Sequence, residues 1–426
     1  MARNRMDLHE LETFVATMVA SWKIPGLALG IGSIDKNLIE IYHGKLDDDP
    51  HHLVNHDSVF CVASIGKFVV ALAVLQLHEQ GVIDIDAPIV SYLPELHLPD
   101  KKEHEITVTM LLNHRSGLPD FTLKEYVELL HEPKMDWKTY VNLHPVTISS
   151  PGVQFKYSNL GYDILGMIIQ EVTHMPFTTY MKTVLEQLSM HHSYFSKPTD
   201  KNHLAMPYVR IPALTISKTY PYNAFDAPSS FMHTTIRDML NLYRNIDKII
   251  SKSTFQQMTT SHSNRSYPPF YEATGLGINI GHFEQEVVFS HGGMGFGFSG
   301  FYMMFPTRDI SAVVLLNEES FAHHHLAHAM AHVITNTPLQ QPRVSWIIKI
   351  ADIFHQSGLQ QAIQYARMMV ADPQSTYEID PYDLMNLIYQ MIVAEEQTTA
   401  KAFLDLYLDL YPDDEEALDI KSVFNF

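Results

Sequence analysis

The sequence predicts a protein of mixed α and β structure that contains an antiparallel sheet and ends in an all-helical part. Three observations support this fold class. An uninterrupted apolar run over residues 68–75 is typical of a buried helix. Strand-like segments separated by turn residues follow one another over residues 275–317. After residue 345, apolar residues recur at helical spacing.

The composition is that of a folded globular protein and argues against a nucleic-acid partner. Of the 426 residues, 46% are apolar and 11% are aromatic. The formal net charge of −19 repels phosphate backbones and anionic membrane surfaces. The longest apolar run is too short to cross a bilayer. We therefore expect no nucleic-acid partner and no membrane span.

The N-terminal segment and the single cysteine favour a cytoplasmic location. Acidic residues interrupt residues 8–22, which read as an amphipathic helix and lack the apolar core of a secretory signal. Cys61 is the only cysteine, which excludes an internal disulfide and fits a reducing compartment. We expect Cys61 to be a buried apolar residue.

The first strands form a predicted hairpin. Strand patterns over residues 26–31 and 38–43 flank turn residues at 35–37. This hairpin carries a Ser-x-x-Lys pair, Ser33 and Lys36, which no buried helix follows. We assign this pair no chemistry.

A second Ser-x-x-Lys pair, Ser64 and Lys67, stands at the first turn of the predicted buried helix. The spacing places both side chains on one helix face. Burial favours the neutral amine, which can accept the serine proton, and the helix N-terminus favours an oxyanion. Because this spacing also arises by chance, a purely structural role remains the alternative until other motifs are considered.

A further candidate pair follows a Pro-Gly turn at residues 151–152. Tyr157 and Asn159 lie where extended chain becomes the predicted helix over residues 159–173. A phenol there can exchange a proton with a serine or a leaving group, and an amide can anchor a substrate carbonyl or the lysine. The Tyr-x-Asn spacing alone is weak support for such roles.

The last part of the sheet contains a glycine-rich stretch. After a predicted helix over residues 236–250, strands are predicted over residues 275–280, 287–290, 300–305 and 310–317. Between two of them, residues 292–300 contain five glycines. Glycine is costly in a strand unless another backbone or a ligand must come close. This stretch therefore suits an edge strand at an active site.

Taken together, these stretches resemble the serine β-lactamase and penicillin-binding-protein superfamily, and most closely its class C-like branch of esterases and D-amino-acid peptidases. Ser64 with Lys67 resembles the first motif, Tyr157 with Asn159 the second, and His291 with Gly293 the third. Residues 111–119 also run as in family members. The similarity covers about residues 24–336.

The resemblance implies an α/β fold of the α+β sandwich type. An antiparallel sheet is flanked by helices, and an all-α subdomain is inserted between its first and last strands. The implied activity is that of a serine hydrolase that uses no metal or cofactor. Residues 1–336 would form this hydrolase domain. Its substrate would be a small-molecule or peptide acyl compound: an ester, an amide or a D-amino-acid peptide.

The resemblance also implies a role for each motif residue. Ser64 attacks the carbonyl, while Lys67 and Tyr157 share the proton transfers. Asn159 orients the substrate and the lysine, and His291 lines the third side of the site. The oxyanion hole is formed by the backbone N–H groups of Ser64 and of Met294, just past Gly293.

One departure from the family pattern bears on the substrate. Gly292 stands where penicillin-recognising members carry a hydroxyl residue, and His291 replaces the commoner lysine. Both changes weaken the binding of a carboxylate, so we expect β-lactam turnover to be absent or slow. The alternatives are a penicillin-binding DD-carboxypeptidase or β-lactamase, which would require export, and a scaffold protein without catalysis.

The C-terminal part reads as a separate helical domain. Residues 337–344 contain two prolines and are interpreted as a linker. Helices are predicted over residues 346–357, 359–371, 382–394 and 398–411. The paired helices of residues 345–426 resemble a degenerate tetratricopeptide pair, and a packed appendage is the alternative. A protein partner or self-association through these helices is possible.

His324, His328 and His332 share one helix face at a spacing of four residues. Such a row could hold a metal ion, but no carboxylate or cysteine stands at matching spacing. We therefore predict no metal site and interpret the row as a surface that faces solvent or a partner.

Overall fold

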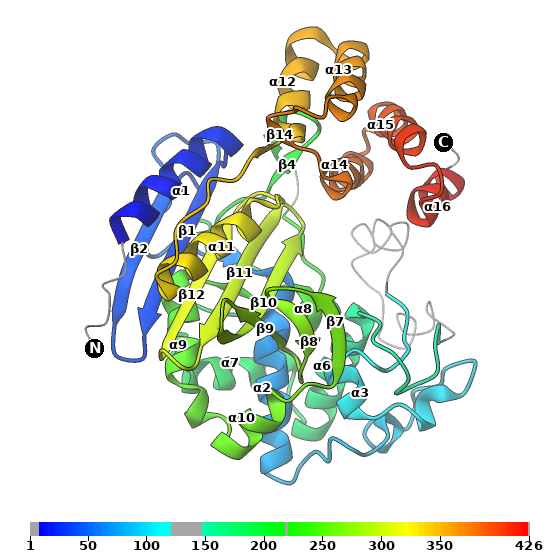
Figure 1. The fold of residues 1–426 in the computed structure, drawn as a ribbon. Coiled ribbons are helices and arrows are strands. Elements are labelled where there is room, and N and C mark those ends of the chain that lie inside the picture. The colour runs from blue at the N-terminus through cyan, green and yellow to red at the C-terminus, as the bar shows by residue number, and fades with distance from the viewer. Residues whose placement is uncertain (1–7, 121–146, 218–219, 425–426) are drawn as a thin grey trace.

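The centre of the molecule is an eight-stranded antiparallel sheet with the strand order β2-β1-β12-β11-β10-β9-β8-β7 (Figure 1). The computed structural model describes residues 8–120, 147–217 and 220–424. The strands are β1 (Gly26–Ser33), β2 (Asn37–Gly44), β7 (Ser263–Tyr267), β8 (Tyr271–Thr274), β9 (Asn279–Phe283), β10 (Glu286–Gly295), β11 (Phe298–Phe305) and β12 (Ile310–Leu316). The predicted fold class, an antiparallel sheet flanked by helices, is confirmed.

Each face of the sheet contributes to a different hydrophobic core, because successive side chains of a strand point to opposite faces. Phe301 of β11 joins the core beneath α1 (Leu8–Trp22) and α11 (Ala322–Thr335), whereas Tyr302 joins the core on the other face. Figure 1 shows α1 and α11 in front of the sheet and most other helices behind it. The sheet is therefore the middle layer of three.

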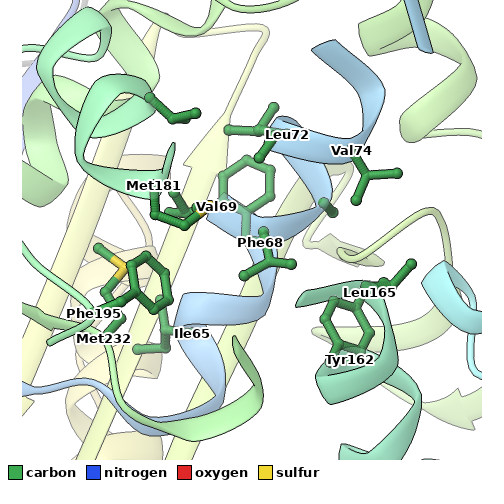
Figure 2. Close-up of a cluster of buried hydrophobic side chains, with 14 of the residues drawn as sticks. Ile65, Phe68, Val69, Leu72, Val74, Tyr162, Leu165, Met181, Phe195 and Met232 are labelled. Carbon is green, nitrogen blue, oxygen red and sulfur yellow. The ribbon is translucent and has the colours of Figure 1, made fainter. Parts of the chain in front are cut away.

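The larger core surrounds α2 (Gly66–Glu79), in which residues 66–77 are all buried. Figure 2 shows Phe68 and Leu72 of this helix among side chains of neighbouring helices, including Tyr162 and Met181. Burial of one large apolar side chain contributes roughly 1.5–3 kcal/mol. The prediction of a helix buried on nearly all sides is confirmed.

The remaining helices of this part lie between β2 and β7 in the sequence. Among the described residues they are α3 (Val108–Leu112), α6 (Asn159–Thr173), α7 (Phe177–Gln187), α8 (Ala227–Ser230), α9 (Ile236–Arg244) and α10 (Lys252–Met258). Two short antiparallel pairs connect parts of this region: β3 (Phe60–Cys61) with β6 (His233–Thr234), and β4 (Tyr208–Arg210) with β5 (Leu214–Ile216). Cys61 is buried, as expected.

Three predicted elements differ from the structure. The strand expected over residues 287–290 continues through the first glycines as β10 and ends at Gly295. Residues 275–278 were expected to begin a strand, but they form the connection between β8 and β9. The N–H groups of Leu276 and Gly277 bond to the carbonyls of Met258 and Leu112 in the helical layer. The helix expected over residues 236–250 ends at Arg244 and is followed by a 3₁₀ turn, Ile246–Lys248.

The C-terminal part has its own core and begins after residues 337–343, which form neither helix nor strand. Its elements are β13 (Val344–Ser345), α12 (Trp346–Ser357), α13 (Leu359–Ala371), β14 (Tyr377–Glu378), α14 (Pro381–Val393), α15 (Gln397–Leu410) and α16 (Glu415–Val423). Helix α12 packs on α13, and α14 packs on α15. Figure 1 shows these helices beyond one end of the sheet. The tetratricopeptide likeness stays a prediction.

The histidine row of α11 forms the expected surface only in part: its members are half-buried, and His328 and His332 line a surface cavity of about 600 Å³. His328 and His332 pack edge-on against the ring of Phe283, and His324 packs in the same way against Phe301. The side chains are therefore part of the contact between α11 and the sheet. Across the described residues, no helix is both long and apolar enough to cross a membrane.

Candidate active site

Ser64 lies in a 3₁₀ turn, Ala63–Ile65, that leads directly into α2. Ala63 has a φ of 46°, a left-handed conformation that non-glycine residues rarely adopt. The N–H of Val62 bonds to the carbonyl of Met232 at 2.9 Å, which anchors the chain before the turn. Ser64 is thus held, partly exposed, at the start of the buried helix, where the sequence predicts it.

Lys67 is completely buried one turn further on. Its Nζ lies 2.9 Å from Ser64 Oγ, 2.7 Å from Asn159 Oδ1 and 2.6 Å from the carbonyl oxygen of Ser229. Burial lowers the pKa of Lys67 to about 8, although the carboxylates of Asp163 and other nearby residues oppose the shift. At pH 7, about a tenth of this lysine is therefore uncharged, and about half is uncharged at pH 8.

Tyr157 and Asn159 flank Ser158, the N-cap residue of α6, and Asn159 is the first residue of the helix. Ser158 caps this helix, since its Oγ accepts the N–H of Gly161 at 3.2 Å. The same hydroxyl donates to the carbonyl of Pro119 at 2.8 Å. Held in this way, Tyr157 donates its phenol proton to Ser64 Oγ at 2.9 Å. The structure therefore brings the first two motifs together around one oxygen atom.

His114 supports Tyr157 from behind, a role that the sequence did not indicate. Its Nδ1 accepts the N–H of Ser158 at 3.2 Å, and its ring stacks on that of Tyr157 at 4.3 Å. Burial and the neighbouring Lys67 hold the pKa of His114 well below its ordinary value, so the ring is neutral. Residues 111–119 contribute to the family resemblance, but no motif or spacing singles out His114.

The other two partners of Lys67 are Asn159, which Asp120 holds in place, and the backbone carbonyl of Ser229. Asp120 accepts both the backbone N–H and the side-chain amide of Asn159 at 3.1 Å, which turns Oδ1 of Asn159 toward the lysine. The carbonyl of Ser229 belongs to α8, and the N–H of Ser229 bonds to Asp163 at 3.2 Å. Because Ser229 acts through its backbone, no residue type marks it in the sequence.

The third motif lies inside β10. This strand pairs with β9 only as far as Ser290, so residues 291–295 have a single neighbouring strand, β11. A Cβ at Gly293 would stand 2.3 Å from the carbonyl oxygen of Val62, which confirms the close backbone approach that the glycines suggested. His291 is 6% exposed, and burial lowers its pKa to about 3. The imidazole is therefore neutral.

A cleft of about 640 Å³ opens at Ser64. Of the predicted site residues, Ser64, Asn159 and Met294 line it, whereas Lys67, Tyr157, His291 and Gly293 do not. Residues of α14 and α16 also line the cleft, which the sequence did not predict. Within the three described ranges, no group of three histidine, cysteine or acidic residues is arranged to hold a metal ion.

Comparison with known proteins identifies the family of the chain. The family model described as Beta-lactamase matches residues 11–336. The chain belongs to the Beta-lactamase family. The match contains the three motifs and leaves out the C-terminal helices. Hydrolases that use a serine nucleophile, including amidases and β-lactamases, make up this superfamily.

Two relatives and three solved structures illustrate the similarity. Protein flp of Staphylococcus aureus is 26% identical over 318 residues, which are 73% of this chain and 63% of that protein. The chain thus spans just under two thirds of the length of this relative. A probable hydrolase, clz13, of Cochliobolus lunatus is 23% identical over 231 residues, which are 42% of this chain and 38% of that protein.

The solved structures share the fold. An octameric penicillin-binding protein homologue from Pyrococcus abyssi has a TM-score of 0.71 at 24% identity and covers 83% of this chain and 82% of its own. A D-amino acid amidase from Ochrobactrum anthropi has a TM-score of 0.68 at 21% identity, with 77% and 97% covered. A class C beta lactamase from Rhodobacter sphaeroides has a TM-score of 0.64 at 18% identity, with 76% and 98% covered.

Proposed function

We propose that the protein is a serine hydrolase that forms an acyl-enzyme on Ser64. The arrangement of hydrogen bonds around Lys67 carries this proposal. Two of its three partners, Asn159 Oδ1 and the carbonyl of Ser229, can only accept hydrogen bonds, whereas Ser64 can also donate. A neutral amine keeps its two N–H groups on those acceptors and turns its lone pair toward the serine hydroxyl. Deprotonation of Lys67 thus prepares Ser64 for attack.

The reaction then proceeds in two halves. Ser64 Oγ bonds to the carbonyl carbon while its proton passes to Lys67, and the electron pair of the C=O bond moves to the oxygen. The N–H groups of Ser64 and Met294, both on the cleft wall, stabilise that oxyanion. The bond to the leaving group breaks as Lys67 and Tyr157 return a proton to it. Water then attacks the acyl-enzyme, which releases the acid and restores Ser64.

Desolvation keeps Tyr157 in its protonated form, since it raises the pKa of the phenol above its ordinary value. The phenol therefore remains a hydrogen-bond donor to Ser64 Oγ and stabilises negative charge there. Asn159 positions Lys67, and Asp120 positions Asn159. Gly293 supports the site by allowing β10 to approach the chain that leads to Ser64.

The proposed substrates are esters, amides or D-amino-acid peptides other than β-lactams. Binding of a β-lactam carboxylate would benefit from a hydroxyl and a positive charge beside the nucleophile. Gly292 offers no hydroxyl, and the neutral His291 offers no charge. This supports slow or absent β-lactam turnover, and rapid hydrolysis of nitrocefin would contradict it.

The deciding experiment compares hydrolysis of p-nitrophenyl butyrate by three proteins: the wild type, Ser64→Ala and Ser33→Ala. Ser33→Ala is a matched control because it removes the serine of the hairpin pair, which has the same spacing to a lysine. We expect Ser64→Ala to lose at least about 10³-fold in kcat/KM and Ser33→Ala to retain activity. Equal activity of Ser64→Ala and the wild type would overturn the proposal and favour the scaffold alternative.

The proposal extends to the organisation of the whole chain. Residues 1–336 would form the hydrolase domain, 337–344 a linker and 345–426 a helical domain. The P. abyssi homologue is octameric, which supports self-association as a second proposal for this chain. Light scattering during size-exclusion chromatography tests it, and a monomer at micromolar concentration would contradict it.

A further inference from the structure

The C-terminal helices form one wall of the cleft at Ser64. The cleft is lined by residues of α14, by Ala394 just after it, and by residues of α16. They are Tyr389, Gln390 and Val393 of α14 and Glu416, Asp419 and Ile420 of α16. These residues lie outside the part of the chain that matches the family model. The surface that a substrate meets at Ser64 is therefore only partly that of the Beta-lactamase family.

Hydrogen bonds hold this wall in place. The side-chain amides of Asn386 and Gln390 both donate to the carbonyl of Glu319 at 3.3 Å. Gln390 Oε1 also accepts the N–H of Arg210 at 2.7 Å. Glu319 in turn accepts the N–H of Gly297 at 3.3 Å, in the turn that follows Met294 and Gly295. Helix α14 is thus connected to the strand that lines the site.

The charged side chains on the wall of the cleft are acidic, and the positive charge near them is that of Lys67, behind the nucleophile. Among the described residues that line the cleft, five are acidic and none is lysine, arginine or histidine: Asp120, Asp226, Glu319, Glu416 and Asp419. Burial raises the pKa of Glu319 to about 7, so this residue is only partly charged near neutral pH. Glu416 and Asp419 are exposed and lie three residues apart on one face of α16. Tyr389 donates its phenol proton to Glu416, which links this carboxylate to α14.

The cleft also presents aromatic rings. Tyr220, Tyr222, Phe296 and Tyr389 all line it. Faces of aromatic rings attract organic cations, and the attraction grows when the cation is desolvated. Aromatic rings and carboxylates around one cavity are the combination that recognises an ammonium group. The hydroxyl of Tyr220 is buried and has no hydrogen-bond partner among the described residues, which is a second observation, independent of the acidic residues, that indicates a ligand.

We propose that the cleft selects acyl substrates that carry a positively charged organic group, which Glu416 and Asp419 attract from the C-terminal wall. The proposal rests on the proposed hydrolase function and names the class of its substrate. The site itself is the cleft at Ser64. The two carboxylates of α16 determine which acyl compounds enter it.

The test uses three p-nitrophenyl esters of similar length that differ in charge. The cationic ester is that of 4-(trimethylammonio)butanoate, and the neutral ester is that of 5,5-dimethylhexanoate, in which a carbon atom replaces the nitrogen. The anionic ester is that of 4-sulfobutanoate. Because the charges are permanent, pH does not alter them. We expect kcat/KM of the wild type for the cationic ester to exceed that for the neutral ester about tenfold at low salt.

Two double variants assign this preference to residues. Glu416→Gln with Asp419→Asn removes the proposed carboxylates, and Asp413→Asn with Glu415→Gln removes equal charge from exposed positions that do not line the cleft. We expect the ratio of the two kcat/KM values to fall several-fold in the first variant and to persist in the second. Circular dichroism verifies that both variants are folded.

The outcomes separate the inference from the function on which it rests. If the wild type prefers the neutral or the anionic ester, or if both variants keep the ratio, charge selection by α16 is overturned. Loss of hydrolysis in Ser64→Ala would still support the hydrolase. If the folded wild type cleaves none of the three esters, both the proposed function and this inference are overturned.

Discussion

Among the single residues of the site, Lys67 determines how the proposed reaction depends on pH. Only its unprotonated amine accepts the proton of Ser64, and burial places its pKa at about 8. We expect kcat/KM to rise as the pH increases through about 8 and to level off above it. The measurement is a pH–rate profile with a p-nitrophenyl ester, corrected by the rate of Ser64→Ala.

The variant Lys67→Arg tests the same argument without a pH series. A guanidinium remains charged throughout the accessible pH range and cannot accept a proton. Activity should be lost although the positive charge is kept. A flat pH profile for the wild type, or an active Lys67→Arg variant, would exclude Lys67 as the base.

Gly293 shows how closely β10 approaches the nucleophile. A methyl group there would meet the carbonyl oxygen of Val62 at 2.3 Å, so β10 or the turn before α2 would have to move. We expect Gly293→Ala to cost about 1–3 kcal/mol of stability and most of the activity. Urea unfolding and ester hydrolysis measure the two effects.

Gly161 provides the control for this substitution. A methyl group at this position of α6 would have its first neighbouring atom at 3.6 Å, an ordinary van der Waals distance. Alanine is also the better helix former, so Gly161→Ala should leave stability unchanged or slightly raised. If Gly293→Ala proved as stable and active as Gly161→Ala, the close approach of β10 to the carbonyl of Val62 would not be needed for stability or activity.

At the scale of elements, a buried ion pair lies next to the hydrogen bond that connects α14 with β4. Arg210 of β4 donates from Nε to Glu318 at 3.0 Å, and its backbone N–H bonds to Gln390 of α14. Burial raises the pKa of Glu318, while Arg210 opposes this shift. Removing one partner leaves the other charge buried without compensation, at a cost of about 3–5 kcal/mol.

We therefore expect Arg210→Met to lower the thermal unfolding midpoint markedly. The double variant Arg210→Met with Glu318→Leu should regain most of this loss, because two apolar residues of similar volume leave no buried charge. Scanning calorimetry of the two variants and the wild type provides the comparison. If the double variant is no more stable than Arg210→Met, the loss of stability comes from the missing hydrogen bonds and packing of the pair, and not from an unpaired buried charge.

Elements with strong periodic patterns could be predicted from the sequence. The apolar run of α2 and the strands β1, β11 and β12 correspond to continuous patterns, and the structure confirms them. Strand β7 was missed because polar and exposed residues dominate it. Its neighbour, β8, was missed as well. Residues 275–278 look like a strand because Leu276 and Ile278 are buried, yet their backbone bonds to helices.

The site was predictable where chemistry depends on side chains in recognisable motifs. The hydrogen bonds of Ser64, Lys67, Tyr157 and Asn159 could be anticipated because the three motifs together resemble those of a known family, whose members assign each residue a role. The carbonyl of Ser229 could not, since it lies 162 residues from Lys67 in the sequence and any residue type offers a carbonyl. The wall formed by α14 and α16 depends on how two units pack, which composition and periodicity do not encode.

At the scale of the whole molecule, the sheet joins segments from distant parts of the chain. Strand β1 lies between β2 and β12, and the side-chain amide of Asn317 bonds to the carbonyl of Lys45, 272 residues away in sequence. Pairing over such separations makes folding slow, because a long loop must close before the contact forms.

This topology has a consequence for synthesis on the ribosome. When the hairpin of β1 and β2 leaves the exit tunnel, the edge of β1 that will pair with β12 has no partner. This edge stays unpaired until β12 has been translated. At about 5–20 residues per second, that delay lasts on the order of tens of seconds. An unpaired apolar edge can meanwhile pair with other nascent chains. The yield of folded protein should therefore depend on chaperones that shield this edge during translation.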